Sequence, residues 1–434
     1  MYLFQVLVID NIKKYYLFIF LQLLLWTPLI YDKTPIIKPK FLEGVDSVFT
    51  KPKNNFDAWF QNAFQSEYEE YLNNSNVLRP FFVRIKNQLD YSLFNTTAAP
   101  GVVIGKQNNL FIKSYIEDYN GSNFLGEKII DKKLFRIKFL QNELKKKNID
   151  LVVIFAPGKA SFYPEYIPDN YLRFKKDTSN FSYMSQKAKE LNINTIDFNS
   201  FFKKIKDSCS IKIYPKNGAH WTSYAVGLAA DSLIKYIEKL KGIDLPDLSW
   251  NKINYSKDAK YSDNDISKLL NLQFNIKEGN LPYPEFVFNK TDKKILKSIV
   301  ISDSYWWGFI DNNIEANIFP ENQFWFYFKD IYKNGSKINS VSNINVKTEI
   351  ERNDLIILMA TEATLFMFPF DFEYKLGEDY LTGLQLTELF IDIIARDKNW
   401  CLLIARKAAE LNQPVGTVLL NEAYFMAKEK MNGR

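Results

Sequence analysis

Short apolar runs alternate with amphipathic stretches through the middle of the chain. The apolar runs are typical of strands that are buried on both faces, and the stretches between them repeat apolar residues at helical spacing. Because this alternation is typical of a parallel sheet with helices on both faces, we predict an α/β fold. The predicted strands are residues 150–156, 194–198, 297–301 and 354–359, and the predicted helices are residues 132–147, 181–191 and 221–240.

Upstream of this alternation, residues 55–93 carry aromatic residues at helical spacing among acids and amides. This pattern predicts an amphipathic helix whose aromatic stripe faces a core. Residues 101–105 and 108–111 predict two short strands joined by a polar turn. The stripe consists of Phe56, Trp59, Phe60, Phe64 and Tyr68.

Downstream, the chain is mostly helical, including residues 384–394 and 415–431. We therefore expect an α/β domain at residues 55–376 and a helical region at 377–434. Stretches rich in lysine and asparagine predict solvated loops, and they are residues 250–265 and 330–350.

The N-terminal segment predicts an uncleaved membrane anchor in residues 1–32. Two lysines, Lys13 and Lys14, precede an apolar run at residues 15–30. By the positive-inside rule the N-terminus is then cytoplasmic and the rest of the chain lies outside the cytoplasm, in the periplasm. A cleaved signal peptide is the alternative, although no small-residue cleavage site follows the run. Residues 33–54, rich in proline and lysine, predict a spacer.

Composition excludes some classes of protein. The net charge of the 434 residues is +6, and no dense basic patch indicates nucleic-acid binding. The cysteines, Cys209 and Cys401, are far apart, and with one histidine they argue against a zinc site. We therefore expect no metal or other cofactor. The two thiols either pair outside the cytosol or stay free.

Candidate chemistry begins with His220, the only histidine. Imidazole titrates near neutral pH and is the commonest general base, although a structural histidine is the alternative.

Ser304 follows the predicted strand 297–301, and open α/β sheets place their sites at such strand ends. The backbone N–H groups after it would hold an oxyanion. A nucleophilic serine needs a base, and His220 is the only histidine to provide it. The alternative is that Asp303 or Ser304 only caps a helix.

Two other strand ends carry candidate residues. Lys159 follows strand 150–156, where it would stabilise negative charge or bind an acidic sugar; a surface lysine in a turn is the alternative. Glu362 follows strand 354–359, where it would bind substrate or orient a partner group.

Three blocks, in this order along the chain, resemble the SGNH hydrolase-like O-acetyltransferases of the alginate O-acetylation family. That family carries Pro-x-Lys…Tyr-Pro-Glu, Asp-x-His-Trp and Gly-Asp-Ser-aromatic blocks. The resemblance covers residues 55–370. It implies an SGNH-like fold, Ser304 as nucleophile, a polysaccharide acceptor, attachment to the inner membrane and a multi-pass membrane acyltransferase partner. The matching blocks are Pro157-Gly158-Lys159…Tyr163-Pro164-Glu165, Gly218-Ala219-His220-Trp221 and Ser302-Asp303-Ser304-Tyr305.

The chain departs from the family pattern in two places. Gly218 stands where the family has the aspartate of its triad, and a glycine cannot orient an imidazole. We expect Asn217 or Glu362 to orient it instead, and a Ser–His dyad or an impaired site are the alternatives. Ser302 replaces the leading glycine of the serine block.

Three functions stay open from the sequence. The first is an extracytoplasmic O-acetyltransferase that modifies a cell-surface or secreted polysaccharide through an acyl-serine. The second is a carbohydrate acetylesterase, in which water is the acceptor. The third is a non-catalytic glycan-binding or assembly subunit. We expect Tyr305 and Trp306 to contribute to the binding of substrate or glycan.

Overall fold

The computed structural model describes residues 15–23, 25–27, 41–44, 50–53, 56–61, 63–75, 78–173, 176 and 178–433. The chain divides into two compact units, which are Met1–Ile104 with Ile266–Ile276 and Gly105–Asp265 with Lys277–Arg434.

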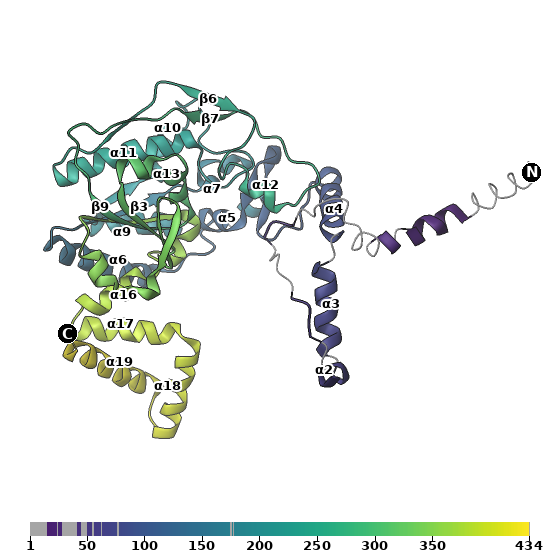
Figure 1. Cartoon of the computed structure of the whole chain (residues 1–434). Helices are drawn as coiled ribbons and strands as arrows, with labels where there is room; N and C mark the ends of the chain where they lie inside the picture. Colours follow the sequence, from purple (N-terminus) through teal and green to yellow (C-terminus); the bar gives the residue numbers. More distant parts are fainter. Residues whose placement is uncertain are drawn as a thin grey trace, which may run out of the picture. The chain divides into compact units, whose positions relative to one another are not determined.

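The larger unit is built on a seven-stranded mixed sheet (Figure 1). Its order is β12-β11-β10-β9-β13-β3-β4, in which β10, β9, β13, β3 and β4 are parallel and β11 and β12 are antiparallel. The predicted parallel sheet is confirmed for β3, β4, β9 and β13, and β10 is a parallel strand that the sequence analysis did not predict. The strands are β3 (Asp150–Ala156), β4 (Thr195–Asp197), β9 (Lys297–Ser302), β10 (Glu321–Phe326), β11 (Asp330–Lys333), β12 (Ser336–Ser340) and β13 (Leu355–Thr361).

The antiparallel edge corrects the prediction that residues 330–350 form a solvated loop. That stretch contains all of β11 and all of β12, together with a short helix, α15 (Val346–Ile350). Its strands were missed because β12 is largely exposed and has no apolar face. An exposed edge strand lacks the alternation by which a buried strand is detected.

Helices cover both faces of the sheet. Residues 151–156 of β3 are at most 1% exposed, so apolar side chains are buried on each face. One face packs against α6, α9 and α16, and α10, α11 and α13 lie on the other side (Figure 1). The helices are α6 (Glu127–Lys145), α9 (Asn180–Glu190), α10 (Phe198–Ile205), α11 (Ser223–Lys241), α13 (Trp307–Asp311) and α16 (Phe372–Tyr380).

Three parallel strands end at one edge of the sheet, and this edge positions the site. Met359 of β13 pairs with Ser302 of β9, and Thr361 of β13 pairs with Ala156 of β3. The turns after the three strands therefore lie together, where open α/β sheets place their ligands. They lead into α7 (Lys159–Phe162), η3 (Ser304–Trp306) and η5 (Glu362–Met367).

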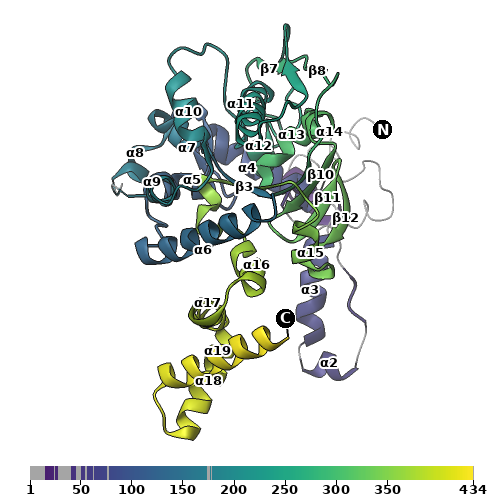
Figure 2. The same cartoon turned by 90° about the vertical axis from the view of Figure 1, so that its left-hand side faces the viewer.

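The predicted C-terminal helices are confirmed, with one more helix between them. They are α17 (Gly383–Arg396), α18 (Lys398–Leu411) and α19 (Val415–Asn432), which share a small apolar core (Figure 2). Asp392 of α17 forms ion pairs with Lys132 and Arg136 of α6. These pairs attach the helical region to α6, which packs on the sheet.

In the smaller unit, the predicted aromatic helix is broken into shorter ones. The chain forms α2 (Phe56–Phe60), α3 (Ala63–Ser75) and α4 (Arg79–Phe94). Trp59 and Phe60 are 52% and 70% exposed, whereas Phe64 is buried. The prediction that the stripe faces a core is therefore wrong for Trp59 and Phe60. The break after α2 interrupts the helical repeat that would have aligned these rings.

Short strands form where the sequence predicts them, as β1 (Val102–Ile104) and β2 (Leu110–Ile112). Residues 15–23 and 25–27 are helical. In the part of the chain that the structure describes, no helix has the length and apolarity needed to cross a bilayer. Most of the predicted spacer at residues 33–54 lies outside the described residues.

Candidate active site

A buried carboxylate holds the turn that presents Ser304. One oxygen of Asp303 accepts the backbone N–H of Tyr305 at 3.0 Å. Its other oxygen accepts the backbone N–H and the hydroxyl of Thr361, both at 2.8 Å, and the hydroxyl of Thr364 at 2.6 Å. These bonds tie the turn after β9 to the end of β13, and Ser304 stays partly exposed.

Ser304 lies at the end of a chain of three polar side chains. Its Oγ is 2.8 Å from Nε2 of His220, and Nδ1 of His220 is 2.6 Å from Oδ2 of Asp265. The second oxygen of Asp265 accepts the backbone N–H of Ala219 at 2.9 Å, which fixes the carboxylate. The arrangement is that of a serine, histidine and aspartate triad. The structure thus brings together Ser304 and His220 and adds an aspartate that the sequence analysis missed.

Position 218 has no space for a side chain, because the backbone just before Asp265 passes close to it. A Cβ atom at position 218 would lie 2.6 Å from the carbonyl oxygen of Asp263 and 2.8 Å from that of Ser262. The backbone before Asp265 therefore passes through the space that a side chain at position 218 would need. The glycine makes room for the segment that supplies the carboxylate from another part of the chain.

The charge of Asp265 sets the protonation of His220. Burial opposes the charged imidazole, but the hydrogen bond and the negative charge of Asp265 outweigh it, and the pKa of His220 is raised above 6.5. Asp303 and Asp311 contribute in the same direction. With the Nδ1 proton donated to Asp265, Nε2 of the neutral ring is left to accept the proton of Ser304.

Lys159 is buried and is fully occupied by the protein. Its ammonium group donates to the carbonyl oxygens of Leu110, Lys216 and Gly218 at 2.8, 2.8 and 2.9 Å. An ammonium group has three donors, so none is left for a sugar. Burial lowers the pKa of Lys159 to about 7. The predicted contact with substrate is therefore wrong, because Lys159 instead fixes the loop that carries His220.

Neither residue expected to orient His220 does so. The Glu362 carboxylate accepts the backbone N–H of Gly158 at 3.2 Å and the side-chain amide of Asn199. Burial raises the pKa of Glu362 to about 7. Asn217 donates its backbone N–H to Glu278 at 2.8 Å, and its buried side chain has no hydrogen-bond partner among the described residues. Asp265 occupies the position on Nδ1 that we had assigned to these two.

Tyr305 and Trp306 are core residues, and the expectation that they bind substrate is wrong. Both are fully buried. The Tyr305 hydroxyl donates to the carbonyl of Ala219 at 2.8 Å, and its ring centroid lies 4.9 Å from that of His220. Trp306 stacks on Phe309 with centroids 4.2 Å apart. Tyr305 thus packs against His220 and bonds to the loop that carries it, and Trp306 packs in the core next to the turn that carries Ser304.

Tyr327 is a further residue at the site that the sequence did not signal. Its backbone N–H donates to the carbonyl of Ser302 at 2.9 Å, which places Tyr327 beside the turn that carries Ser304. Tyr327 and Phe328 have φ values of 50° and 54°, a left-handed conformation that is uncommon for aromatic residues. Burial, followed by the charge of Asp303, raises the pKa of Tyr327 to about 12. The hydroxyl of Tyr327 therefore stays protonated at neutral pH.

The cysteines are not bonded to each other: Cys209 is partly buried and Cys401 is exposed, both as free thiols. Within the described ranges, no group of three or more histidine, cysteine, aspartate or glutamate side chains is placed to hold a metal ion.

Comparison with known proteins connects this site to a family. Residues 102–260 match the family model of the SGNH hydrolase-like domain of acetyltransferase AlgX. The match confirms the resemblance predicted from the sequence and includes His220, but it ends before Asp265 and Ser304.

Two curated relatives are similar over part of the chain. The chain is 26% identical over 185 residues to the probable alginate O-acetylase AlgJ of Pseudomonas aeruginosa, covering 43% of this chain and 44% of that protein. It is 24% identical over 151 residues to the probable alginate O-acetylase AlgJ of Pseudomonas putida, covering 35% and 37%. Each alignment therefore spans less than half of the relative. The solved O-acetyltransferase domain of Pseudomonas putida AlgJ aligns with a TM-score of 0.43 at 15% identity, covering 62% of this chain and 93% of that domain.

Proposed function

We propose that this chain, which carries an SGNH hydrolase-like domain, is an O-acetyltransferase that acetylates a polysaccharide hydroxyl through Ser304. The observation that carries the proposal is the hydrogen-bonded series Ser304, His220 and Asp265 at the carboxyl edge of the sheet. The curated relatives are named as alginate O-acetylases, which supports the acetyl group and a polysaccharide acceptor.

In the first half-reaction, His220 takes the proton of Ser304 as its Oγ attacks the carbonyl carbon of the acetyl donor. Asp265 stabilises the imidazolium that forms. The tetrahedral oxyanion then collapses, the bond to the donor breaks, and His220 returns the proton to the leaving group. The product is an acetyl ester on Ser304.

In the second half-reaction, a sugar hydroxyl gives its proton to His220 and attacks the acetyl ester. When the bond to Ser304 breaks, Ser304 takes the proton back from His220 and the acetylated sugar leaves. Because water would complete the same step, exclusion of water decides between transfer and hydrolysis.

We also infer that the domain lies outside the cytoplasm, held by residues 1–32, and receives acetyl groups from a multi-pass membrane acyltransferase. Lys13 and Lys14 before the apolar run support this orientation, as does the family resemblance. Exposed Cys401 provides the test. A membrane-impermeant maleimide should label it in cells whose outer membrane alone is permeabilised, and a Cys401→Ser variant should lose that label. Labelling only after lysis would place the domain in the cytoplasm.

The catalytic proposal is tested with the full chain, an activated acetyl ester and glycan oligosaccharides. Intact mass should show one acetyl group on the wild type and none on Ser304→Ala or His220→Ala. A Ser342→Ala variant, at an exposed serine, is the matched control. Acetyl found on the oligosaccharide supports a transferase, whereas free acetate alone indicates an esterase. Acetylation that persists in Ser304→Ala would reject the assignment of the nucleophile.

A further inference from the structure

Helix α4 of the smaller unit exposes its apolar face and packs its polar face inward. The apolar face is a stripe with the spacing i, i+3, i+7 and i+11, here called the α4 stripe, and it consists of Phe82, Ile85, Leu89 and Leu93. Three of its members, Phe82, Leu89 and Leu93, are 47%, 52% and 68% exposed. Because a surface helix of a globular protein normally buries such a stripe, this one needs cover from outside the described residues.

The polar face of α4 is fixed to its own unit by hydrogen bonds. Arg84 is buried and donates to the carbonyl of Phe41 at 2.6 Å. The side-chain amide of Asn87, on the same face, donates to the carbonyl of Leu270 at 2.9 Å. Since these bonds hold the helix by its polar side, α4 cannot turn its apolar stripe inward without breaking them.

Other apolar side chains of the same unit are exposed as well. Phe81 is 46% exposed, and its ring centroid lies 5.6 Å from that of Phe82. Trp59 and Phe60 of α2 are exposed, and the helical residues 15–23 are exposed throughout. Exposed tryptophan, phenylalanine and leucine on helices are typical of segments that lie at a membrane–water interface.

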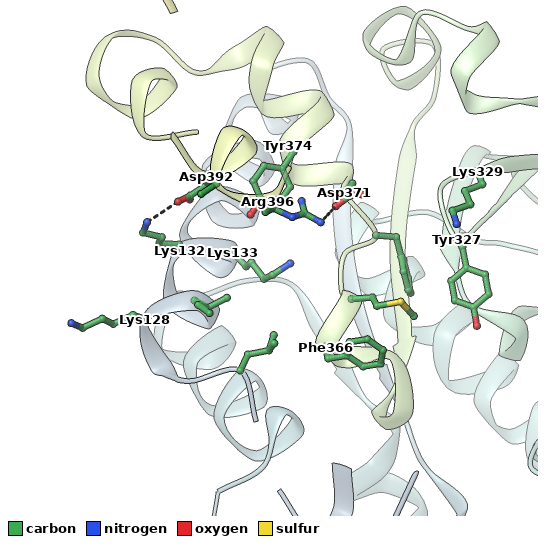
Figure 3. A pocket seen from close by; sticks show the side chains of 15 residues that line it. Lys128, Lys132, Lys133, Tyr327, Lys329, Phe366, Asp371, Tyr374, Asp392 and Arg396 are labelled. Carbon is green, nitrogen blue, oxygen red and sulfur yellow. Dashed lines mark hydrogen bonds and ion pairs between the residues drawn. The ribbon is translucent and has the colours of Figure 1, made fainter. Parts of the chain in front are cut away.

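An exposed apolar surface in the larger unit has a different character. In the hollow between α6 and α17, apolar side chains such as Phe366 are interleaved with charged ones (Figure 3). Asp392 forms an ion pair with Lys132 there, and Asp371 forms one with Arg396. Such charges would lose their hydration in hydrocarbon, which is costly. The α4 stripe has no charged member, so it can enter hydrocarbon without that cost.

Two exposed cations border the α4 stripe. Arg79 lies three residues before Phe82 and Lys86 lies four residues after it, so both stand beside the stripe on the helix surface. Lys86 pairs with Asp90 at 2.6 Å in an exposed ion pair. Long basic side chains at the border of an apolar face reach the phosphates of a lipid layer while the apolar side chains lie deeper.

The length of α4 favours a position in the plane of a membrane. Its 16 residues form a helix about 24 Å long, whereas a spanning helix needs about 20 consecutive and predominantly apolar residues. Its polar face is also bonded to protein. A helix with these properties lies on a bilayer and does not cross it.

A second copy of the chain would be a poor cover for the stripe. An aromatic side chain offers roughly 150–250 Å², so one that is half exposed adds about 100 Å² to an interface. The three exposed members of the stripe, with Phe81, therefore offer on the order of 400 Å², half of the roughly 800 Å² that each partner buries in a stable dimer. A bilayer sets no such minimum, because each apolar side chain that enters it contributes on its own.

We infer that the α4 stripe inserts into the surface of a phospholipid bilayer, with the helix axis parallel to the membrane plane. The choice of a bilayer rests on the proposed attachment by residues 1–32, because those residues and α4 belong to the same compact unit. The stripe would lie about 5–10 Å deep, at the boundary between headgroups and acyl chains. It would give the chain a second contact with lipid.

The test uses the full chain in vesicles of phosphatidylethanolamine and phosphatidylglycerol, with an environment-sensitive fluorophore on a single thiol. Cys209→Ser and Cys401→Ser remove the native thiols, and Leu89→Cys carries the label. Nitroxide lipids should quench this label about twofold or more strongly than a label at Glu69→Cys, an exposed polar position on α3 of the same unit. Equal quenching at the two positions would overturn the inference.

A substitution of the stripe tests whether its apolar side chains cause the insertion. Leu89→Gln with Leu93→Gln keeps good helix formers at exposed positions but removes apolar surface, so a label at Phe82→Cys should lose its quenching by nitroxide lipids. Glu67→Gln with Glu70→Gln, at exposed positions of α3, is the matched control and should leave that quenching unchanged. Quenching that persists in the Leu89 and Leu93 variant would contradict the inference.

The outcomes separate this inference from the proposed function. A label at Leu21→Cys reports the attachment by residues 1–32: if it is quenched and the Leu89 label is not, the attachment stands and the inference fails. If neither is quenched, both fail. A Leu89 label that is shielded from water but not quenched by lipid, and loses its shielding on dilution, would show that a second copy covers the stripe. Acetylation of Ser304 by a small ester should be unchanged in the glutamine variant, so the catalytic proposal is tested independently.

Discussion

At the scale of single residues, Asp265 is the most informative position. It fixes the tautomer of His220, so Asp265→Asn should leave the fold intact and lower kcat by about 10⁴-fold, the loss typical of a triad whose aspartate becomes an amide. Asp258→Asn, at an exposed aspartate in the same segment, should leave kcat unchanged. Rates are measured with a small acetyl ester. A loss below tenfold would show that the pair Ser304 and His220 works without Asp265.

The same carboxylate predicts a pH dependence. In the proposed mechanism neutral His220 is the base, and its pKa is raised above 6.5, so activity should fall as pH decreases through that raised value. In Asp265→Asn the charge that raises the pKa is lost, and the acid limb of the residual rate should move to lower pH. The limb is read from kcat/KM of the free enzyme. An acid limb that does not move would mean that another group titrates.

Gly218 offers a separate test at this scale. Because a Cβ at position 218 would collide with the backbone at residues 262–263, Gly218→Asp should not restore activity to Asp265→Asn. It should instead destabilise the fold, measured by urea unfolding, by about 1–3 kcal/mol, as overpacking does. Recovery of activity in the double variant would show that the aspartate can return to the position that it has in the family pattern.

At the scale of elements, the loop that carries His220 depends on Lys159. Lys159→Met removes three hydrogen bonds to carbonyl groups, of which only that of Lys216 keeps a second donor, the backbone N–H of Leu110. We therefore expect the free energy of unfolding to fall by about 3 kcal/mol. Lys239→Met, at an exposed lysine, should change it by less than about 0.5 kcal/mol. A loss of activity without any loss of stability would restore a direct role of Lys159 in substrate binding.

Elements also differ in how far the sequence predicts them. β3 has the predicted bounds of residues 150–156, because a strand buried on both faces is a continuous apolar run. The pairing of Ser304 with His220 followed from residue chemistry and strand ends. The contact between Asp265 and His220 could not be predicted in this way. It forms when a polar loop folds back onto the histidine, and no local sequence pattern marks such a contact. Gly218, at the position where the family has an aspartate, was the one sequence feature that reflects the close approach of the backbone at residues 262–263.

At the scale of the whole molecule, one ion-pair cluster couples the helical region to the SGNH hydrolase-like domain. Asp392 bonds to Lys132 and to Arg136, which is buried against α17. Asp392→Asn leaves the Arg136 guanidinium without its carboxylate, and breaking a partly buried pair from one side costs about 1–3 kcal/mol. Since the ion pair lies between α17 and α6, the cost should fall on the attachment of the helical region and not on the sheet.

Hydrogen exchange should therefore show α17–α19 losing protection together in Asp392→Asn, while β3 and β13 keep theirs. Glu388→Gln, at an exposed glutamate of the same helix, should change neither. Acetylation of Ser304 by a small ester should stay at the wild-type rate, because the sheet that carries the site is unchanged. Loss of protection across the sheet would instead mean that the helical region and the SGNH hydrolase-like domain unfold as one cooperative unit.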